Sequence, residues 1–415
     1  MQIKKILVSL QTFYKTNKKM MEAFFRTHAY LVEHTNAPVR RLLMDEIDWN
    51  DRMIGIKGTR GVGKTTFLLQ YAKENFDIYD RKCLYVNMNN FYFQGRGIAD
   101  FAGEFYKRGG KVLLVDQIFK ETDWSSQLRK CHDLYPDLKI VFTGSSVMRL
   151  KEENPELNGI VKSYNLRGFS FREFLNLQTG NRFRPYTLDE ILRNHEHIAR
   201  QILPYVSPSK YFQDYLHHGF YPFFLEHRNY SENLLKTMNM MTEVDILLIK
   251  QIELKYLTKI KKLFYQLAVE GPKAPNVSQL AHDIQTSRAT VMNYIKYLTD
   301  ARLLNMIYPC GQDFPKKPSK VMLHNSNLMY AIYPIEIKKQ EVMETFFVNS
   351  LWKDHKVNQG NKESYYIVDD EKRFRICDAD AKSKIRLNAD TIYARYNSEI
   401  GKDNQIPLWL LGFLY

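Results

Sequence analysis

Short apolar runs alternate with helix-length segments through the first part of the chain. The strand-like runs cover residues 53–57, 83–87, 112–116 and 140–143, and residues 66–71 begin the first amphipathic helical pattern. Strands that alternate with helices predict a parallel sheet with helices on both faces, which binds its ligands at the carboxyl ends of the strands. The pattern therefore predicts an α/β domain over residues 51–180, preceded by a helical lead-in over residues 1–50.

The pattern becomes mostly helical after about residue 165. Residues 188–203 and 234–269 carry long amphipathic helical spacing. This spacing predicts a helical lid or connector over residues 181–270. The Gly/Pro-rich stretch 271–276 then interrupts the pattern, and a break of this composition is typical of a domain boundary.

A helix–turn–helix pattern follows the break. Residues 277–284 predict a short helix, and Ser287 is suited to cap a second helix. The second helix would bury one apolar stripe, made of Val291, Tyr294, Ile295 and Leu298. Two strand-like runs then flank a polar Pro/Lys segment, so we expect a winged helix over residues 271–330.

The last part of the chain, residues 331–415, predicts a small α+β domain. A helical pattern begins near residue 343, and short strand-like runs follow it. The final apolar run, residues 406–415, is too short to cross a membrane, so we interpret it as a buried strand.

Residues 58–65 read Gly-x4-Gly-Lys-Thr and lie between a predicted strand and a predicted helix. In that context the motif predicts a phosphate-binding loop, because glycines let the backbone N–H groups surround an anion at a helix N-terminus. Lys64 is expected to reach the β- and γ-phosphates, and the Thr65 hydroxyl to bind Mg²⁺. The residues expected to hold the triphosphate are Gly58, Thr59, Arg60, Gly61, Val62, Gly63, Lys64, Thr65 and Thr66.

The apolar run 112–115 ends in Asp116, a carboxylate placed to bind Mg²⁺ together with Thr65. The next residue is Gln117, at the position where an acidic side chain usually activates the attacking water. An amide can orient a water but cannot accept its proton, and loss of a general base costs roughly 10²–10⁴-fold in rate. Nucleotide binding is therefore predicted more firmly than hydrolysis.

Composition adds limits to this interpretation. The 415 residues are 44% hydrophobic, which is enough for two or three packed domains. A formal net charge of +14 favours phosphate-rich partners, but an excess of basic side chains that only face solvent would give the same net charge. The four cysteines are scattered, and no segment resembles a secretory signal or a membrane helix, so we expect a cytoplasmic protein with reduced thiols.

With these residues in view, the chain resembles, almost end to end, a prokaryotic family of AAA-type ATPases. In that family a P-loop domain precedes a winged helix and a C-terminal domain of restriction-endonuclease-like fold. The segments that carry the resemblance are 55–66, 123–124, 140–146, 168–174, 215–222, 275–276 and 406–409. The resemblance implies that the ligands are ATP and Mg²⁺.

The resemblance also assigns roles near the nucleotide. Ser145 or Ser146 would occupy the sensor position beside the γ-phosphate, although these hydroxyls are equally suited to cap the next turn. Residues 156–160 stand where the family usually has arginines, and none is present. Together with Gln117, this departure weakens the expectation of turnover.

In the nuclease-like domain the family uses two carboxylates and a lysine, because two acidic ligands must hold the cation. Tyr365 and Arg375 stand at the two acidic positions of this chain. Other carboxylates lie nearby in the sequence, but on segments where solvated side chains are the simpler explanation: Glu344, Asp369, Asp378 and Asp380. We therefore expect this domain to be inactive as a nuclease.

The second helix of the helix–turn–helix pattern has a polar face suited to phosphates and base edges. Its candidate nucleic-acid contacts are Arg288, Thr290, Asn293 and Lys296, with Lys316, Lys317 and Lys320 on the wing. Such helices also serve as packing modules, so DNA contact is an alternative function and a protein partner is another. The leading hypothesis is a Mg²⁺-dependent ATP-binding protein with slow or absent hydrolysis; whether it is an enzyme, and its oligomeric state, stay open.

Overall fold

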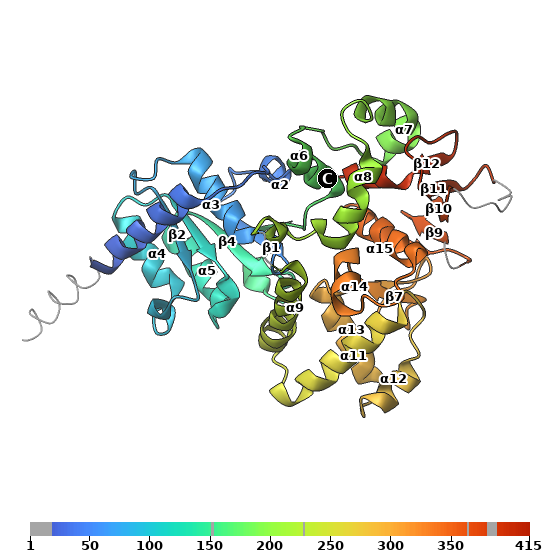
Figure 1. Cartoon of the computed structure of the whole chain (residues 1–415). Helices are drawn as coiled ribbons and strands as arrows, with labels where there is room; N and C mark the ends of the chain where they lie inside the picture. The colour runs from blue at the N-terminus through green and yellow to red at the C-terminus, as the bar shows by residue number, and fades with distance from the viewer. Residues whose placement is uncertain (1–18, 151–152, 227–228, 363–364, 380–387) are drawn as a thin grey trace, which may run out of the picture. The chain divides into compact units, whose positions relative to one another are not determined.

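The computed structural model describes residues 19–150, 153–226, 229–362, 365–379 and 388–415. They form two compact units (Figure 1). The first unit contains residues up to 58 together with 63–166, and the second contains residues 59–62 together with 167–415. None of the helices described is both long and apolar enough to cross a membrane.

The first unit is an α/β domain with one five-stranded sheet. Residues 19–34 are helical and precede it, as the lead-in pattern predicts. Its elements are α2 (Leu43–Glu46), β1 (Met53–Gly58), α3 (Lys64–Asn75), β2 (Cys83–Asn87), η1 (Phe91–Phe93), α4 (Ile98–Lys107), β3 (Val112–Asp116), η2 (Ile118–Lys120), α5 (Trp124–Leu134), β4 (Lys139–Ser145), η3 (Pro155–Leu157) and β5 (Lys162–Asn165).

The sheet of the first unit has the strand order β2-β3-β4-β1-β5, and all of its pairings are parallel. Strands β1 and β3 are almost wholly buried, as their continuous apolar runs require. The register sets Asn87 of β2 opposite Asp116 of β3. The carboxyl ends of β2, β3 and β4 therefore bring polar residues together beside the start of α3.

The second unit begins with helices. They include two short π-helical segments, η4 and η6. The long helix expected over residues 234–269 is interrupted at residues 250–253, where Gln251 has a φ of 50°. The elements are α6 (Phe171–Thr179), α7 (Leu188–Ile202), α8 (Pro208–Asp214), η4 (Tyr215–Gly219), η5 (Pro222–Glu226), α9 (Tyr230–Met240), η6 (Met241–Ile246), α10 (Leu247–Ile249), η7 (Leu254–Tyr256) and α11 (Leu257–Glu270).

Two helices and a hairpin come next in the second unit. Helix α12 (Val277–Asp283) and helix α13 (Arg288–Asp300) are joined by a short turn, and the Ser287 hydroxyl accepts a hydrogen bond from the Thr290 N–H at 3.1 Å. Val291, Tyr294, Ile295 and Leu298 are buried, which confirms the predicted apolar stripe. Strands β6 (Leu304–Ile307) and β7 (Lys320–Leu323) pair antiparallel, and residues 308–319 connect them.

The C-terminal part of the second unit contains a second five-stranded sheet, of order β12-β11-β10-β9-β8. Strands β8, β9 and β10 pair antiparallel, whereas β10, β11 and β12 pair parallel. Helix α15 packs against β10. The elements are α14 (Ser326–Ile332), α15 (Lys339–Leu351), β8 (Val357–Gln359), β9 (Tyr365–Val368), β10 (Lys372–Asp378), β11 (Ile392–Tyr396), β12 (Gln405–Pro407) and η8 (Leu408–Phe413).

The last apolar run corrects one prediction. Only Gln405–Pro407 is a strand, and Leu408–Phe413 forms a fully buried 3-10 helix. A continuous buried run contains no polar alternation, so its periodicity cannot separate a strand from a short helix.

Candidate nucleotide site

The loop between β1 and α3 has the backbone that the motif predicts. Gly63 adopts φ 92° and ψ 25°, in the left-handed region where only glycine is free of strain, and it caps helix α3. The first helical residue is Lys64, whose Nζ donates a hydrogen bond to the carbonyl oxygen of Gly58 at 2.7 Å. Thr65 and Thr66 follow in the first turn, and both are exposed. The helix N-terminus and the lysine are therefore placed to receive an anion.

Asp116 is the centre of a hydrogen-bonded cluster at the carboxyl end of the sheet. Its Oδ2 accepts from the Thr65 hydroxyl at 2.7 Å, from the Tyr85 hydroxyl at 2.9 Å and from Asn87 Nδ2 at 3.2 Å. Its Oδ1 accepts from the Thr143 hydroxyl. Burial, followed by the Asp116 charge, raises the pKa of the Tyr85 hydroxyl, which therefore stays a donor. Four donors therefore converge on one buried carboxyl group.

Gln117 lies next to this cluster in a strained conformation. Its φ of 59° and ψ of 48° are left-handed, which costs a non-glycine residue about 1–2 kcal/mol. Its N–H donates to the Thr143 hydroxyl oxygen at 2.9 Å. Its side-chain Oε1 is buried, and among the residues that the structure describes it has no hydrogen-bond partner. The combination of backbone strain and an unsatisfied polar atom makes Gln117 a candidate functional residue.

Thr143, two residues before Ser145 on β4, makes the contact to Asp116, whereas the sensor role of Ser145 stays a prediction. Thr143 touches both Asp116 and Gln117. The Ser145 hydroxyl accepts from the Val147 N–H at 3.4 Å, as a hydroxyl that caps the next turn does. Sequence reasoning missed Thr143, Tyr85 and Asn87. The available signal was that each lies at or near the carboxyl end of a predicted strand.

Residues 59–62, the middle of the glycine-rich motif, belong to the second unit. There the Arg60 guanidinium donates to Asp245 Oδ1 at 2.7 and 3.1 Å, and Asp245 is buried. Thr59 and Val62 are also buried. Gly61 has φ +80°, and a Cβ there would meet the Phe223 ring at 2.8 Å. Position 61 therefore requires glycine, because its φ is positive and because a side chain there would meet the Phe223 ring.

The four candidate nucleic-acid residues occupy helix α13 in different states. Arg288 and Asn293 are exposed, whereas Thr290 and Lys296 are partly buried. The Thr290 hydroxyl bonds the Ser287 hydroxyl at 2.9 Å, and Lys296 forms an ion pair with Asp300. Lys316 and Lys317 are exposed in the 308–319 connection.

Lys320 corrects another expectation, because it does not lie on the exposed connection. It begins strand β7, is 4% exposed and pairs with Glu344 at 2.8 Å. The side-chain stem of a lysine is compatible with burial when its ammonium finds a carboxylate, and the sequence alone does not show that partner.

Among the described residues of the C-terminal sheet, the candidate metal ligands do not cluster. Tyr365 and Arg375 are directly opposite each other on β9 and β10, with the Arg375 guanidinium 5.3 Å from the Tyr365 ring centre. Asp369 bonds His355, and Asp380 lies outside the described residues. Within the described ranges, no three His, Cys, Asp or Glu side chains come together as a metal site.

Two family models match parts of the chain. A model described as an AAA domain matches residues 50–175, and a model described as a domain of unknown function (DUF8612) matches residues 209–336. The uncharacterized protein MJ1637 of Methanocaldococcus jannaschii is 27% identical over 285 residues. That match covers 65% of this chain and 59% of the archaeal protein.

Two solved structures show distant similarity. One is the Aeropyrum pernix ORC1 protein in complex with DNA, with 13% identity, a TM-score of 0.29 and coverage of 74% of this chain and 91% of that chain. The other is PCH-2 of C. elegans, with 14% identity, a TM-score of 0.24 and coverage of 68% of each chain. The parallel sheet, the glycine-rich loop before α3 and the AAA-domain match agree on one conclusion: residues 50–175 form a P-loop domain of the AAA type, a fold that binds nucleotides.

Proposed function

We propose that this protein binds ATP with Mg²⁺ and hydrolyses it slowly or not at all. The observation that carries the proposal is Gln117, a strained residue with an unsatisfied buried amide oxygen, directly beside the hydrogen-bonded carboxylate of Asp116. The residues available for Mg²⁺ are the Thr65 hydroxyl and Asp116, which already lie 2.7 Å apart. A bound Mg²⁺ would neutralise phosphate charge.

The protein groups around the triphosphate have distinct tasks in this proposal. The backbone N–H groups at the start of α3 and the Lys64 ammonium bind phosphate oxygens. Gln117 orients a water through its amide oxygen. An amide has no basic site for the proton of that water at neutral pH, so the nucleophile stays weak and nucleotide remains bound as ATP.

The test combines occupancy and turnover on one sample. Millimolar ATP with Mg²⁺ should raise the melting temperature, since ligand at 100 times Kd adds about 2.7 kcal/mol to stability. Lys64→Ala should abolish that rise. Gln117→Glu should keep it and should increase phosphate release by about 10²–10⁴-fold. An unchanged melting temperature would refute ATP binding. Phosphate release by the wild type as fast as by Gln117→Glu would refute the proposal of slow or absent hydrolysis.

A second candidate function is DNA binding through a winged helix. It is supported by the order of elements, with α12, a short turn, α13 and the β6–β7 hairpin, and by an isolated antiparallel bridge between Lys273 and Val321 of β7. Arg288, Asn293, Lys316 and Lys317 are exposed polar or basic residues on this part. Such side chains suit phosphate and base-edge contacts.

A gel shift with duplex DNA at two salt concentrations tests this candidate. Binding at low salt that weakens steeply with added salt is expected from phosphate contacts, and absence of binding at low salt refutes the candidate. Lys316→Ala/Lys317→Ala should lower the salt slope by roughly two, since each phosphate contact contributes about 0.9.

We propose no nuclease chemistry for the C-terminal sheet. Tyr365 and Arg375 supply no carboxylate, and the carboxylate of Glu344 is occupied by the Lys320 ammonium at 2.8 Å. Metal-assisted hydrolysis needs acidic ligands that are open to a cation. This domain therefore needs a different role from the one its family resemblance implies.

A further inference from the structure

Both ends of the 308–319 connection, called the wing loop below, are tied to the C-terminal sheet. At its start, the Asn358 amide donates to the carbonyl oxygens of Tyr308 and Pro309 at 3.1 and 3.3 Å. The backbone N–H of Gln359 also donates to Tyr308 at 2.8 Å. Asn358 and Gln359 belong to β8, the edge strand of the C-terminal sheet. The entry of the loop is thus fixed by three hydrogen bonds to one strand.

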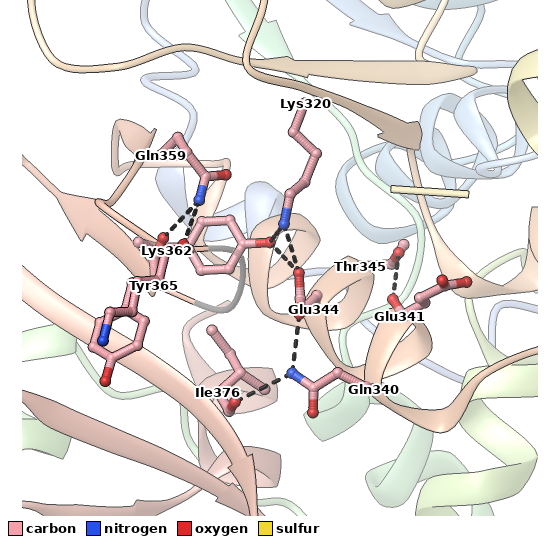
Figure 2. Close-up of polar contacts among 10 residues, drawn as sticks. Lys320, Gln340, Glu341, Glu344, Thr345, Gln359, Lys362, Tyr365 and Ile376 are labelled. Atoms are coloured by element: carbon pink, nitrogen blue, oxygen red, sulfur yellow. Dashed lines mark hydrogen bonds and ion pairs between the residues drawn. The ribbon is translucent and has the colours of Figure 1, made fainter. Parts of the chain in front are cut away.

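The exit of the wing loop is fixed by a buried ion pair. Lys320, the residue directly after the loop, donates from Nζ to Glu344 Oε2 at 2.8 Å (Figure 2). It also donates to the Tyr366 hydroxyl oxygen at 3.0 Å. The Tyr366 hydroxyl donates to the same Glu344 oxygen at 2.6 Å. The three side chains come from β7, α15 and β9, and none is more than 5% exposed. Burial, followed by the Glu344 charge, raises the pKa of the Tyr366 hydroxyl, so it remains a donor.

The second carboxylate oxygen of Glu344 is held as well. Gln340 Nε2 donates to Glu344 Oε1 at 2.9 Å and to the carbonyl oxygen of Ile376 on β10 at 3.1 Å (Figure 2). The Tyr396 hydroxyl of β11 donates to Gln340 at 3.0 Å. A hydrogen-bonded and buried charge pair has essentially one low-energy arrangement, because any displacement leaves a charge unpaired away from water. The position of Lys320 therefore follows the position of the C-terminal sheet.

We propose that the C-terminal sheet is a brace that positions the wing loop for contact with duplex DNA, with Glu344, Tyr366 and Asn358 as positioning residues. This inference rests on the second candidate function. Lys316 and Lys317 lie only a few residues before Lys320, so their exposed ammonium groups are presented from an anchored support. Ordering a loop in advance removes part of the entropy that binding would otherwise cost.

Two measurements test the brace, and one of them needs no DNA. In Glu344→Gln and in the milder Tyr366→Phe, hydrogen exchange at the Ser319 amide, which bonds Ile307 at 2.9 Å, should become about tenfold faster, while exchange inside α13 stays unchanged. Asn358→Ala should have the same effect at the Gln359 amide. The brace is refuted by wild-type exchange at the Ser319 amide in Glu344→Gln and Tyr366→Phe together with wild-type exchange at the Gln359 amide in Asn358→Ala. An equal acceleration throughout α13 refutes it as well.

DNA binding separates a positioning role from a contact role. Glu344→Gln and Asn358→Ala should weaken duplex binding by about tenfold at one salt concentration, because more conformational entropy of the wing loop is lost on binding. The salt slope should stay unchanged, because the same phosphate contacts form. Lys316→Ala/Lys317→Ala should instead lower the slope and leave exchange in the loop unchanged. Wild-type protein that binds no DNA at low salt refutes the second candidate function. Full affinity in the brace variants refutes only this inference.

Discussion

Acidification should destabilise the first unit through one buried histidine. His28 lies in the helix formed by residues 19–34, is 1% exposed, and its Nδ1 accepts a hydrogen bond from the Tyr85 N–H at 3.1 Å. An N–H donor opposite Nδ1 requires that ring nitrogen to be unprotonated. Charging the ring would therefore bury a cation and place two hydrogens against each other. Burial lowers the pKa of His28 to about 4.

The size and sign of the effect follow from linkage. The unfolded chain binds a proton at His28 with a pKa of about 6.5, so between pH 6.5 and pH 4 the unfolded state holds more protons than the folded one. Stability is therefore unaffected above that window and falls as pH decreases through it. Each pH unit is worth about 1.4 kcal/mol, which gives about 2 kcal/mol at pH 5 and about 3 kcal/mol in full.

The assay is urea unfolding of the full chain from pH 8 to pH 4.5, for the wild type and for His28→Asn. Subtracting the two curves removes the contributions of other titrating groups. The difference in free energy of unfolding should be constant above pH 7 and should change by about 2 kcal/mol by pH 5. His34→Asn, at an exposed position of the same helix, should follow the wild type. A flat difference between wild type and His28→Asn would refute the reasoning.

Substitutions at three further places, Gly63, Thr143 and Lys320, have expected outcomes. Gly63→Ala places a side chain at φ 92°, costs about 1–2 kcal/mol and should weaken ATP binding in calorimetry, whereas Gly109→Ala, at φ +87° with open space, should lower stability without changing affinity. Thr143→Val removes the hydroxyl shared by Asp116 and Gln117 and should lower stability by about 1–3 kcal/mol in thermal unfolding. Lys320→Met should cost about 3–5 kcal/mol in urea, and the double variant Lys320→Met/Glu344→Leu should recover most of it.

The sequence predicted those parts of the fold whose polarity pattern is strong. Strands β2 and β3 have the predicted bounds because a buried parallel strand reads as a continuous apolar run. Strand β5, Lys162–Asn165, was missed because it is a polar edge strand with mostly exposed side chains. Its only structural cue is its pairing with β1, which depends on residues more than a hundred positions earlier.

The candidate site was predictable only as far as it is local in sequence. The glycine-rich loop and Asp116 could be found from motif spacing. Tyr85 and Thr143 reach Asp116 only because β2 and β4 flank β3. The order of strands in a sheet cannot be deduced from any single segment of the sequence. Lys320 shows the same limit. A lysine close to Lys316 and Lys317 in the sequence is interpreted as part of a basic surface until the structure shows its buried carboxylate partner.

A protein that holds ATP without hydrolysing it can act only through differences in affinity. In the proposed function, Gln117 stands at the position of a base but cannot accept a proton from water, so bound ATP would leave by dissociation and not by turnover. A ligand that is not consumed shifts a conformational equilibrium only by the ratio of its affinities for the two states. If ATP changes the affinity for DNA by some factor, DNA must change the affinity for ATP by the same factor. We expect this equality in paired titrations of the wild type, and two unequal factors would show that nucleotide is being turned over.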